Sequence, residues 1–407
     1  MDKLGRIFSY LNVIIYSLFK NLTISPYRRK DTKKILVIMA QVGIGDAVSA
    51  LDAFYNLSNH LELKYELYIA TTPEVAHFLK ETQSTFNARL IALELSKEVK
   101  LSFNIFKENQ QKLSVFHWDY IISLNRIGFY LKLLLLGCSY KKIFGMEYIG
   151  QNISVIESLL MKRLNHYHCI YLPTFSHVVS VYRKVVIEAL CEILANNSIP
   201  YFSYFIPILE KNPLEKIKGK YCIICPSIAI QKDHPFANRK WPIDRIISIV
   251  NHILESSELN ICLCGVATDK EDNAYVIKHS KYPSRVINLT GKTSFKQWIE
   301  LIRDAKFVFG NDSGYIHLAH FLGVPSFAIA GYWNYGRFLP YPEEENNKRG
   351  KVFDIRIPMV SCVGCAHRSE IDYDRLKCNQ NIEKYGTYKC IWEINIEMVK
   401  KAINILL

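Results

Sequence analysis

The stretch that decides the fold is Phe309-Gly310-Asn311-Asp312-Ser313-Gly314-Tyr315-Ile316-His317. It joins an expected strand, which ends at Gly310, to an expected helix. Ser313 and Gly314 open that helix, where backbone N–H groups attract anions. Asp312 can accept hydrogen bonds from a ribose or a sugar, or cap the helix, and His317 lies one turn further along the same side. Open α/β sheets bind ligands at such junctions, at the carboxyl ends of their strands.

The same alternation of short β-branched runs and helical patterns extends in both directions from this stretch. It predicts an α/β fold with parallel sheets covered by helices. The expected strands are 35–40, 67–70, 89–95, 120–124, 142–146, 221–225, 260–265, 286–289, 307–310 and 326–330. The order of the strands cannot be read from this pattern.

A region rich in Pro and Asn, residues 195–220, interrupts the alternation and predicts a linker between two Rossmann-like domains. Two such sheets can face each other across a cleft. The expected division of the chain is an N-terminal segment, two domains and a final helix: 1–34, 35–205, 206–390 and 391–407.

A glycine turn follows the first expected strand, at Gly43-Ile44-Gly45-Asp46. Gly43 and Gly45 allow a tight turn and a close approach of the backbone to a ligand. Asp46 can cap the next helix, or serve as a general base at the end of the strand. As a dinucleotide fingerprint the turn is incomplete, because a third glycine is lacking.

Two cations precede a second helix start, at Asn238-Arg239-Lys240-Trp241-Pro242. Pro242 suits the first helical turn, and the two cations can hold a diphosphate or form surface ion pairs.

Four late cysteines, Cys362, Cys365, Cys378 and Cys390, have the spacing C-x2-C-x12-C-x11-C. Four thiolates can bind zinc tetrahedrally, but the usual second Cys-x-x-Cys pair is missing. We expect packed thiols here, with zinc as the alternative. Other cysteines, such as Cys222 and Cys262, lie within apolar strands and indicate a reducing, cytosolic setting.

The N-terminal 34 residues hold eight basic residues against two acidic ones. The apolar stretch 7–19 is too short to span a bilayer, which needs about 20 residues. A helix lying in the plane of an anionic membrane, followed by the basic residues 28–30, 33 and 34, is one interpretation. A helix that packs on its own domain is the other.

The whole chain has 407 residues and a net charge of +13, with 49% hydrophobic and 22% charged residues. These values exclude disordered, collagen-like and coiled-coil chains and favour anionic partners. Nucleic acid is not expected, because the positive charge is concentrated at the N-terminus and no recognition motif is present.

Taken in order, these motifs resemble glycosyltransferase family 9, the heptosyltransferases of lipopolysaccharide assembly. The resemblance covers about residues 35–400. It includes Gly45-Asp46, Lys240-Trp241-Pro242, Leu263-Cys264-Gly265, Asn311-Asp312-Ser313-Gly314 and the late Cys-x-x-Cys. It implies a GT-B fold, with the acceptor mainly on the first domain, a nucleotide sugar mainly on the second, and a last helix that commonly crosses back to the first.

The resemblance also implies an inverting, metal-independent transfer with no cofactor. Asp46 would be the general base, and Lys240 would contact the donor phosphate. Asp312-Ser313-Gly314 would form the donor-binding turn, with His317 beside it. Asp269, or Glu271 close by, would bind the donor ribose. By family default the donor is ADP-heptose and the acceptor is a lipopolysaccharide-core or other cell-surface glycan or glycolipid. The enzyme would lie in the cytoplasm, peripheral at the inner face of the cell membrane.

The sequence departs from the family at 331–336, where Gly-Tyr-Trp-Asn-Tyr-Gly replaces a proline-rich turn. This difference leaves the identity of the sugar open. The competing functions are a nucleotide-sugar epimerase of GT-B fold and a non-catalytic protein that binds a membrane or nucleic acid. The epimerase would need further acid and base groups, and we find no second matched set.

Overall fold

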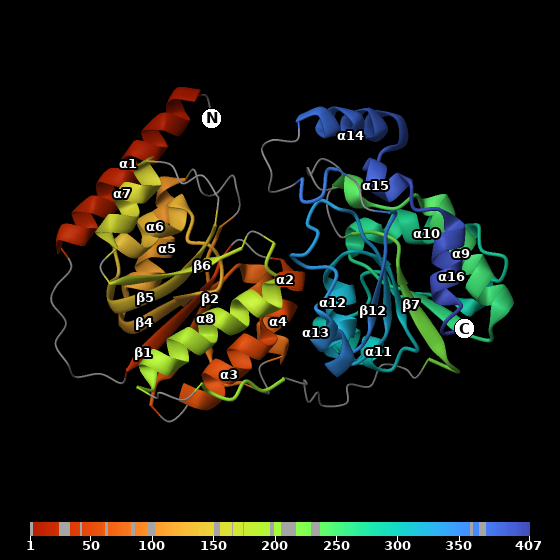
Figure 1. Cartoon of the computed structure of the whole chain (residues 1–407), viewed down its shortest axis with the longest axis horizontal. Helices are drawn as coiled ribbons and strands as arrows, with labels where there is room; N and C mark the ends of the chain where they lie inside the picture. The colour runs from red at the N-terminus through yellow and green to blue at the C-terminus, as the bar shows by residue number, and fades with distance from the viewer. Residues whose placement is uncertain are drawn as a thin grey trace. The chain divides into compact units, whose positions relative to one another are not determined.

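The computed structural model divides the chain into two compact units, Met1–Phe205 and Ile206–Leu407, and each is described by itself (Figure 1). The described residues are 3–23, 33–40, 43–61, 64–82, 86–95, 102–149, 155–164, 166–173, 175–195, 199–204, 217–228, 237–358, 361–365 and 372–407. The side chains of 3–10, 23, 237 and 372–377 are outside the description. Of the predicted basic patch, residues 28–30 also lie outside it.

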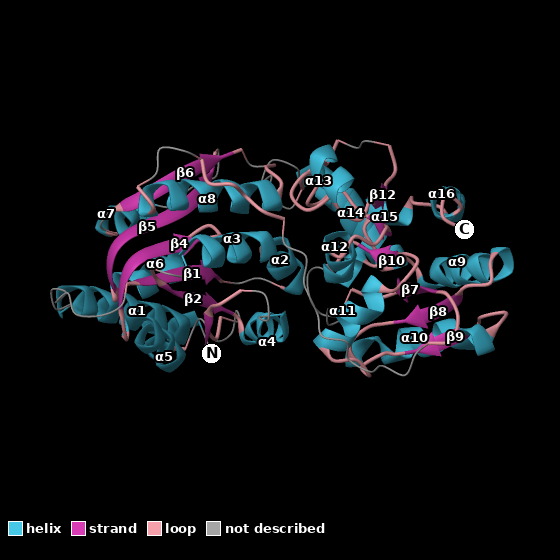
Figure 2. Cartoon of the chain, turned by 90° about the horizontal axis from the view of Figure 1, so that it is seen from below, coloured by secondary structure: helices cyan, strands magenta, loops and turns pink. Residues whose placement is uncertain are grey.

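The first unit is a six-stranded parallel sheet with helices on both faces (Figure 2). The strand order is β3-β2-β1-β4-β5-β6, so the chain reverses its direction of travel between β1 and β4. The strands are β1 Lys34–Met39, β2 Glu66–Thr71, β3 Arg89–Ala92, β4 His117–Ser123, β5 Ser139–Tyr148 and β6 Tyr167–Leu172.

The helices of the first unit form two packed groups, which cover opposite faces of the sheet in Figure 1. One group is α1 Lys3–Thr23, α5 Phe103–Ser114, α6 Phe129–Leu136 and α7 Val155–Arg163. The other is α2 Ile44–Ser49, α3 Leu51–Leu61, α4 Pro73–Thr82 and α8 Val178–Ile193.

The N-terminal helix α1 packs against its own unit, on α5 and α6. Val13 and Ser17 are buried, and the ring of Tyr16 meets Phe103 edge to face at 5.4 Å. The side-chain amide of Asn21 donates to the Leu136 carbonyl at the end of α6, at 2.9 Å. One side of this helix therefore packs on its own domain, as the second interpretation of the segment predicted. None of the helices among the described residues has the length and apolar character needed to cross a membrane.

The second unit has a sheet of the same kind, with the order β12-β11-β10-β7-β8-β9 and parallel pairing throughout. Its strands are β7 Tyr221–Cys225, β8 Asn260–Leu263, β9 Val286–Asn288, β10 Val308–Asn311, β11 Ser326–Ile329 and β12 Val352–Ile355. Its α-helices are α9 Ile243–Ser256, α10 Lys270–Lys278, α11 Phe295–Arg303, α12 Gly314–Phe321, α13 Glu343–Lys348, α14 Asp372–Tyr385, α15 Lys389–Trp392 and α16 Ile396–Ile403.

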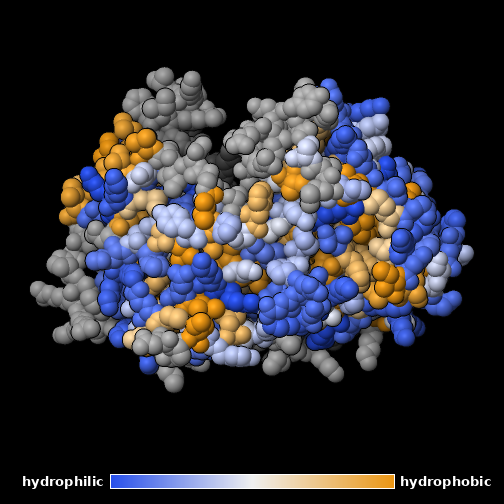
Figure 3. Space-filling view, viewed as in Figure 1, coloured by the Kyte–Doolittle hydropathy of each residue, from blue (hydrophilic) through white to orange (hydrophobic). Residues whose placement is uncertain are grey.

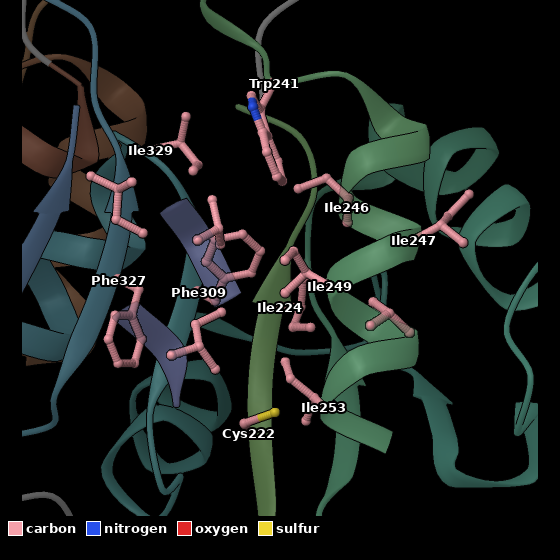
Figure 4. Packing of buried hydrophobic residues seen from close by; sticks show 14 of the residues in the cluster. Cys222, Ile224, Trp241, Ile246, Ile247, Ile249, Ile253, Phe309, Phe327 and Ile329 are labelled. Carbon is pink, nitrogen blue, oxygen red and sulfur yellow. The ribbon is translucent and has the colours of Figure 1, made fainter. Parts of the chain in front are cut away.

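The core of the second unit shows why this sequence forms these elements. Strand β7 (YCIIC) is buried along its whole length, as expected for a central parallel strand. In Figure 4, Ile246, Ile249 and Ile253, spaced three and four residues apart on α9, face this strand. Trp241 closes the end of this core, and its indole N–H donates to the Ile394 carbonyl at 2.9 Å.

The last helix, α16, lies in the second unit by its contacts. It packs on α9 and β12, and its buried residues Val399 and Ile403 belong to the core of that unit. The Arg245 guanidinium donates to the Ile394 carbonyl at 2.7 Å and fixes the segment just before α16. The crossing of this helix to the first domain, which the family resemblance implied, stays a prediction.

Candidate functional site

The candidate residues lie at equivalent positions in the two units. Each sheet has the order 3-2-1-4-5-6, and ligands of such sheets bind beside the carboxyl ends of the two strands where the order reverses. In the first unit these strands are β1 and β4, and Gly43–Asp46 follows β1. In the second unit they are β7 and β10, and Asp312–Gly314 follows β10.

The turn after β10 is held by Asn311, which is fully buried. Its side-chain amide donates to the Pro226 carbonyl at 2.8 Å, just beyond β7. Its side-chain oxygen accepts from the Trp241 backbone N–H, also at 2.8 Å. One side chain therefore joins the two strands of the reversal point to the segment that carries Lys240.

Tyr315 makes a second link across the same point. Its hydroxyl lies 2.9 Å from the Cys225 carbonyl and 3.1 Å from that of Ser227. Burial raises the pKa of Tyr315 well above its ordinary value, so the hydroxyl stays a donor. A Cβ at Gly310 would lie 2.5 Å from the Cys225 carbonyl oxygen, so only glycine allows the strands to approach this closely.

Asp312 lies near His317, Arg239 and Arg356. The His317 ring nitrogen Nε2 is 3.5 Å from its carboxylate, and the other ring nitrogen lies 2.8 Å from the Tyr341 hydroxyl. Burial acts to raise the pKa of Asp312. The hydrogen bond and charge of His317, with the charges of Arg239 and Arg356, outweigh burial and lower that pKa. His317 is only 3% exposed, so its contacts are those of a residue that positions Asp312.

Ser313 and Gly314 begin helix α12 as predicted. Ser313 occupies the N-cap position with extended backbone angles, and its side chain makes no capping hydrogen bond. Both residues are partly exposed, so the backbone N–H groups at this helix start lie near the surface. Such a helix start attracts an anion.

Lys240 forms an ion pair with Asp272 in the first turn of α10. Both side chains are about 30% exposed, so a ligand can reach them. Arg239 stacks on Trp333, with 4.5 Å from its guanidinium carbon to the ring centroid. Burial lowers the pKa of Arg239, and the nearby charge of Asp312 opposes that effect. The adjacent cations Arg239 and Lys240 thus have different partners, Trp333 and Asp272.

The acids that follow Gly265 have three different surroundings. Asp269 is 3% exposed, and its carboxylate accepts from the Val266 backbone N–H at 2.8 Å, which closes the turn after β8. Glu271 is exposed, and Asp272 pairs with Lys240. Asp269, the residue predicted to bind a ribose, therefore also has a structural contact.

The turn after β1 is more open than its counterpart. Gly43 is exposed, and nothing lies within 4 Å of where its Cβ would be. The Asp46 carboxylate accepts from the Gly43 backbone N–H at 3.2 Å, and the Ser49 hydroxyl donates to the Gly45 carbonyl at 3.0 Å. Asp46 is the third residue of α2 and reaches back to the residue before the helix, as the acid of a capping box does. It is half-buried, at the carboxyl end of β1.

A cluster of four charges in the first unit was not predicted. Lys132 of α6 is fully buried, at 3.6 Å from both Glu147 and Glu157. Arg126, which follows β4, pairs with the same two acids, at 2.6 Å to Glu147. Burial acts to lower the pKa of Arg126, but the two glutamates outweigh it and raise that pKa. The signal in the sequence was the single lysine within FYLKLLLL, because a buried charge requires a partner.

The four late cysteines are all partly buried. Burial raises the pKa of Cys390 to about 12 and also raises the pKa of Cys378. Within the described ranges, no group of three or more His, Cys, Asp or Glu side chains is placed to hold a metal ion.

Comparisons with known proteins agree with the arrangement of the strands. The fold is shared with E. coli ADP-heptose lipopolysaccharide heptosyltransferase II, at 17% identity and a TM-score of 0.59, over 92% of this chain and 98% of that one. It is also shared with a glycosyltransferase family 9 protein of Veillonella parvula, at 17% identity and a TM-score of 0.63, over 94% and 99%. The iron-containing dodecameric glycosyltransferase TibC of E. coli has a TM-score of 0.51 at 12% identity, over 94% of this chain and 78% of TibC.

Sequence comparison gives a shorter match. Lipooligosaccharide heptosyltransferase 2 of Haemophilus ducreyi is 25% identical over 173 residues, which are 42% of this chain and 44% of that protein. The matched stretch thus spans less than half of the curated relative. Residues 159–352 match the model of glycosyltransferase family 9 (heptosyltransferase), and this range includes Lys240, Asp269, Asp312 and His317. The resemblance of this chain to glycosyltransferase family 9 is therefore confirmed, on a fold of two Rossmann-like units of the GT-B class.

Proposed function

We propose that the protein is an inverting glycosyltransferase that moves a sugar from a nucleoside diphosphate to a hydroxyl of a cell-surface glycan or glycolipid. The observation that carries the proposal is the turn Asn311-Asp312-Ser313-Gly314, built at the reversal point of a sheet whose sequence matches the family. Heptose is the expected sugar and a lipopolysaccharide core the expected acceptor. The relatives named for heptose transfer support both choices.

In the proposed reaction, Asp46 takes the proton of the acceptor hydroxyl. The hydroxyl oxygen bonds to the anomeric carbon as the bond from that carbon to the diphosphate oxygen breaks. The nucleoside diphosphate leaves with the electron pair, and the configuration at the anomeric carbon inverts. The proton remains on Asp46 until solvent removes it.

The second unit would stabilise the leaving group through backbone and side-chain charge. Lys240 would exchange its pairing with Asp272 for the donor diphosphate, and the N–H groups of Ser313 and Gly314 would face the same anion. Asp312, whose pKa is lowered by His317, Arg239 and Arg356, would accept hydrogen bonds from the donor sugar or ribose. Asp269 or Glu271 remains the proposed ribose contact.

No step of this reaction passes through a metal ion. Since TibC is described as iron-containing, the point needs a test. We expect activity to survive a chelator, with the purified protein assayed before and after treatment. Loss of activity that added metal restores would contradict the proposal.

The identity of the donor sugar is the most informative property to determine. The departure from the family at 331–336 is only partly in reach of a ligand. Tyr332 belongs to the core, and its hydroxyl donates to the Ile357 carbonyl at 2.9 Å. Trp333 and Tyr335 are partly exposed, beneath Arg239 and Arg356 respectively. We expect these two aromatic residues to influence which sugar is accepted.

A thermal-shift screen of nucleotide sugars tests this assignment. ADP-heptose should raise the melting temperature more than UDP- or GDP-hexoses. Stabilisation by a hexose donor alone would refute the heptosyl assignment and leave the transferase proposal in place. With a glycolipid acceptor of the lipopolysaccharide-core type, the proposed reaction takes place in the cytoplasm, at the inner face of a cell membrane.

A further inference from the structure

Helix α1 has a second apolar side that nothing in the described structure covers. Its packed side carries Val13 and Ser17, as described above. Its other side carries Leu11, Ile15, Phe19 and Leu22, which are 50–83% exposed. Positions spaced by four, four and three residues fall within one narrow arc of an α-helix. The exposed stripe is therefore continuous over about three turns.

Helix α7 adds a second exposed apolar stripe on the same face of the sheet. Val155, Ile156 and Leu159 are each more than half exposed. Both α1 and α7 contact α6, which is buried between them and the sheet. In Figure 3, apolar surface gathers over α1 in the view of Figure 1. Large apolar side chains exposed together in this way mark an interaction surface.

The charges on these helices select the partner. Helix α1 contains no acidic residue. The only acid of α7, Glu157, is directed to Lys132 and Arg126 and is only 13% exposed. Lys162 and Arg163 continue the exposed side of α7 at its end. An apolar stripe with basic residues and no exposed acid has the composition of an interfacial helix on anionic lipid.

We propose that the exposed sides of α1 and α7 together form a docking surface for an anionic lipid bilayer. The apolar stripes enter the interface between headgroups and acyl chains, and Lys162 and Arg163 contact the headgroups. Helix α1 thus both completes the fold of the first unit and holds the unit at the membrane. The proposed function supplies the side of the membrane, but the contact itself does not depend on it.

Point substitutions test this surface better than truncation. Deletion of residues 1–30 would also remove Val13 and Ser17 from the core, so it would confuse docking with folding. Ile15→Glu combined with Phe19→Glu changes only the exposed side of α1, and Leu159→Glu changes that of α7. Tyr201→Glu is the matched control. Tyr201 is 80% exposed, and its carbonyl lies 3.0 Å from the His60 ring of α3, in the helix group of the opposite face.

The measurement is co-sedimentation of the full chain with vesicles of phosphatidylcholine mixed with phosphatidylglycerol, against phosphatidylcholine alone. Wild type should prefer the anionic vesicles and be released by salt. The double α1 variant should bind at least about tenfold more weakly, because each exposed apolar side chain contributes to insertion. Leu159→Glu should weaken binding to a smaller extent. Tyr201→Glu should match wild type, and circular dichroism should show all variants folded.

Three results would overturn the proposal. The first is equal sedimentation of wild type and the α1 and α7 variants. The second is an equal loss in Tyr201→Glu. The third is a wild-type dimer in size-exclusion chromatography that the double variant dissociates, since a second copy would then cover the stripe. An assay of sugar transfer to a water-soluble acceptor separates docking from the proposed function. The double variant should keep this transfer activity. A wild type that binds vesicles but never transfers a sugar would refute the proposed function alone.

Discussion

The turns at the two reversal points differ, although the two sheets have the same strand order. In the second unit, Asn311, Tyr315 and His317 are buried and join the turn to its neighbours. In the first unit, the turn from Gly43 to Asp46 is partly exposed, and the space beside Gly43 is open.

This difference separates two ways of building a site on one topology. A buried hydrogen-bond network holds its turn in place before a ligand arrives, which suits an anion site that must stabilise developing charge. A short, open turn leaves a carboxylate within reach of a large acceptor. Substitutions in the first turn should therefore change activity more than stability, and substitutions in the second should change both.

The largest effect should follow Asp46→Asn. If Asp46 is the general base, turnover should fall by about 10²–10⁴-fold. The asparagine oxygen can still accept from the Gly43 N–H, so the melting temperature should change little. Turnover and donor affinity are measured on the same preparations. Near-normal turnover, or a large loss of stability, would break the proposed contrast between the two turns.

Asn311→Ala should have the next largest effect, this time on folding. It leaves the Pro226 carbonyl and the Trp241 N–H without their partner, and a buried unsatisfied group costs about 1–3 kcal/mol. Urea unfolding measures the loss. Asn347→Ala, at an exposed position, is the control and should be neutral. Equal stability of Asn311→Ala and wild type would show that the second turn is not held as described.

Lys240→Ala tests whether Lys240 binds the donor diphosphate in the second unit. Removal of one charge-assisted contact to a diphosphate should raise the donor KM by about tenfold or more, with a smaller change in kcat. Asp272→Asn removes the resting partner of Lys240 and should leave donor affinity equal or higher. A rise in donor KM for Asp272→Asn, with none for Lys240→Ala, would show that Lys240 does not contact the donor diphosphate.

The smallest effect concerns the pH dependence of Asp312. Its pKa is lowered in the folded protein, so its charge stabilises the fold above the ordinary carboxyl value of 3.8. Asp312→Asn should therefore be less stable than wild type at pH 7, and the gap should narrow as the pH falls below that value. Urea unfolding of both proteins between pH 7 and pH 3 measures this. A gap that is constant across the range would show that the charge of Asp312 contributes nothing.

The central strands could be predicted from sequence because they are continuous apolar runs, as in β7. The edge strands β6 and β12 were missed. Tyr171 of β6 is exposed, and the two middle residues of β12, Phe353 and Asp354, are only half-buried, so neither strand is a continuous apolar run. Helix α1 was predicted as a helix, but sequence could not decide between packing and lipid contact. Each interpretation describes one side of it.

The sequence by itself determined the α/β class, the two units and the polar turns after β1 and β10, because local patterns and spacing encode them. Only the tertiary structure decided that Asn311 joins β10 to β7, that Asp272 pairs with Lys240, and that Lys132 lies among two glutamates and Arg126. These partners are far apart in the chain. The order of the strands brings them together, and no local pattern records that order, because each β–α unit looks alike until the sheet assembles.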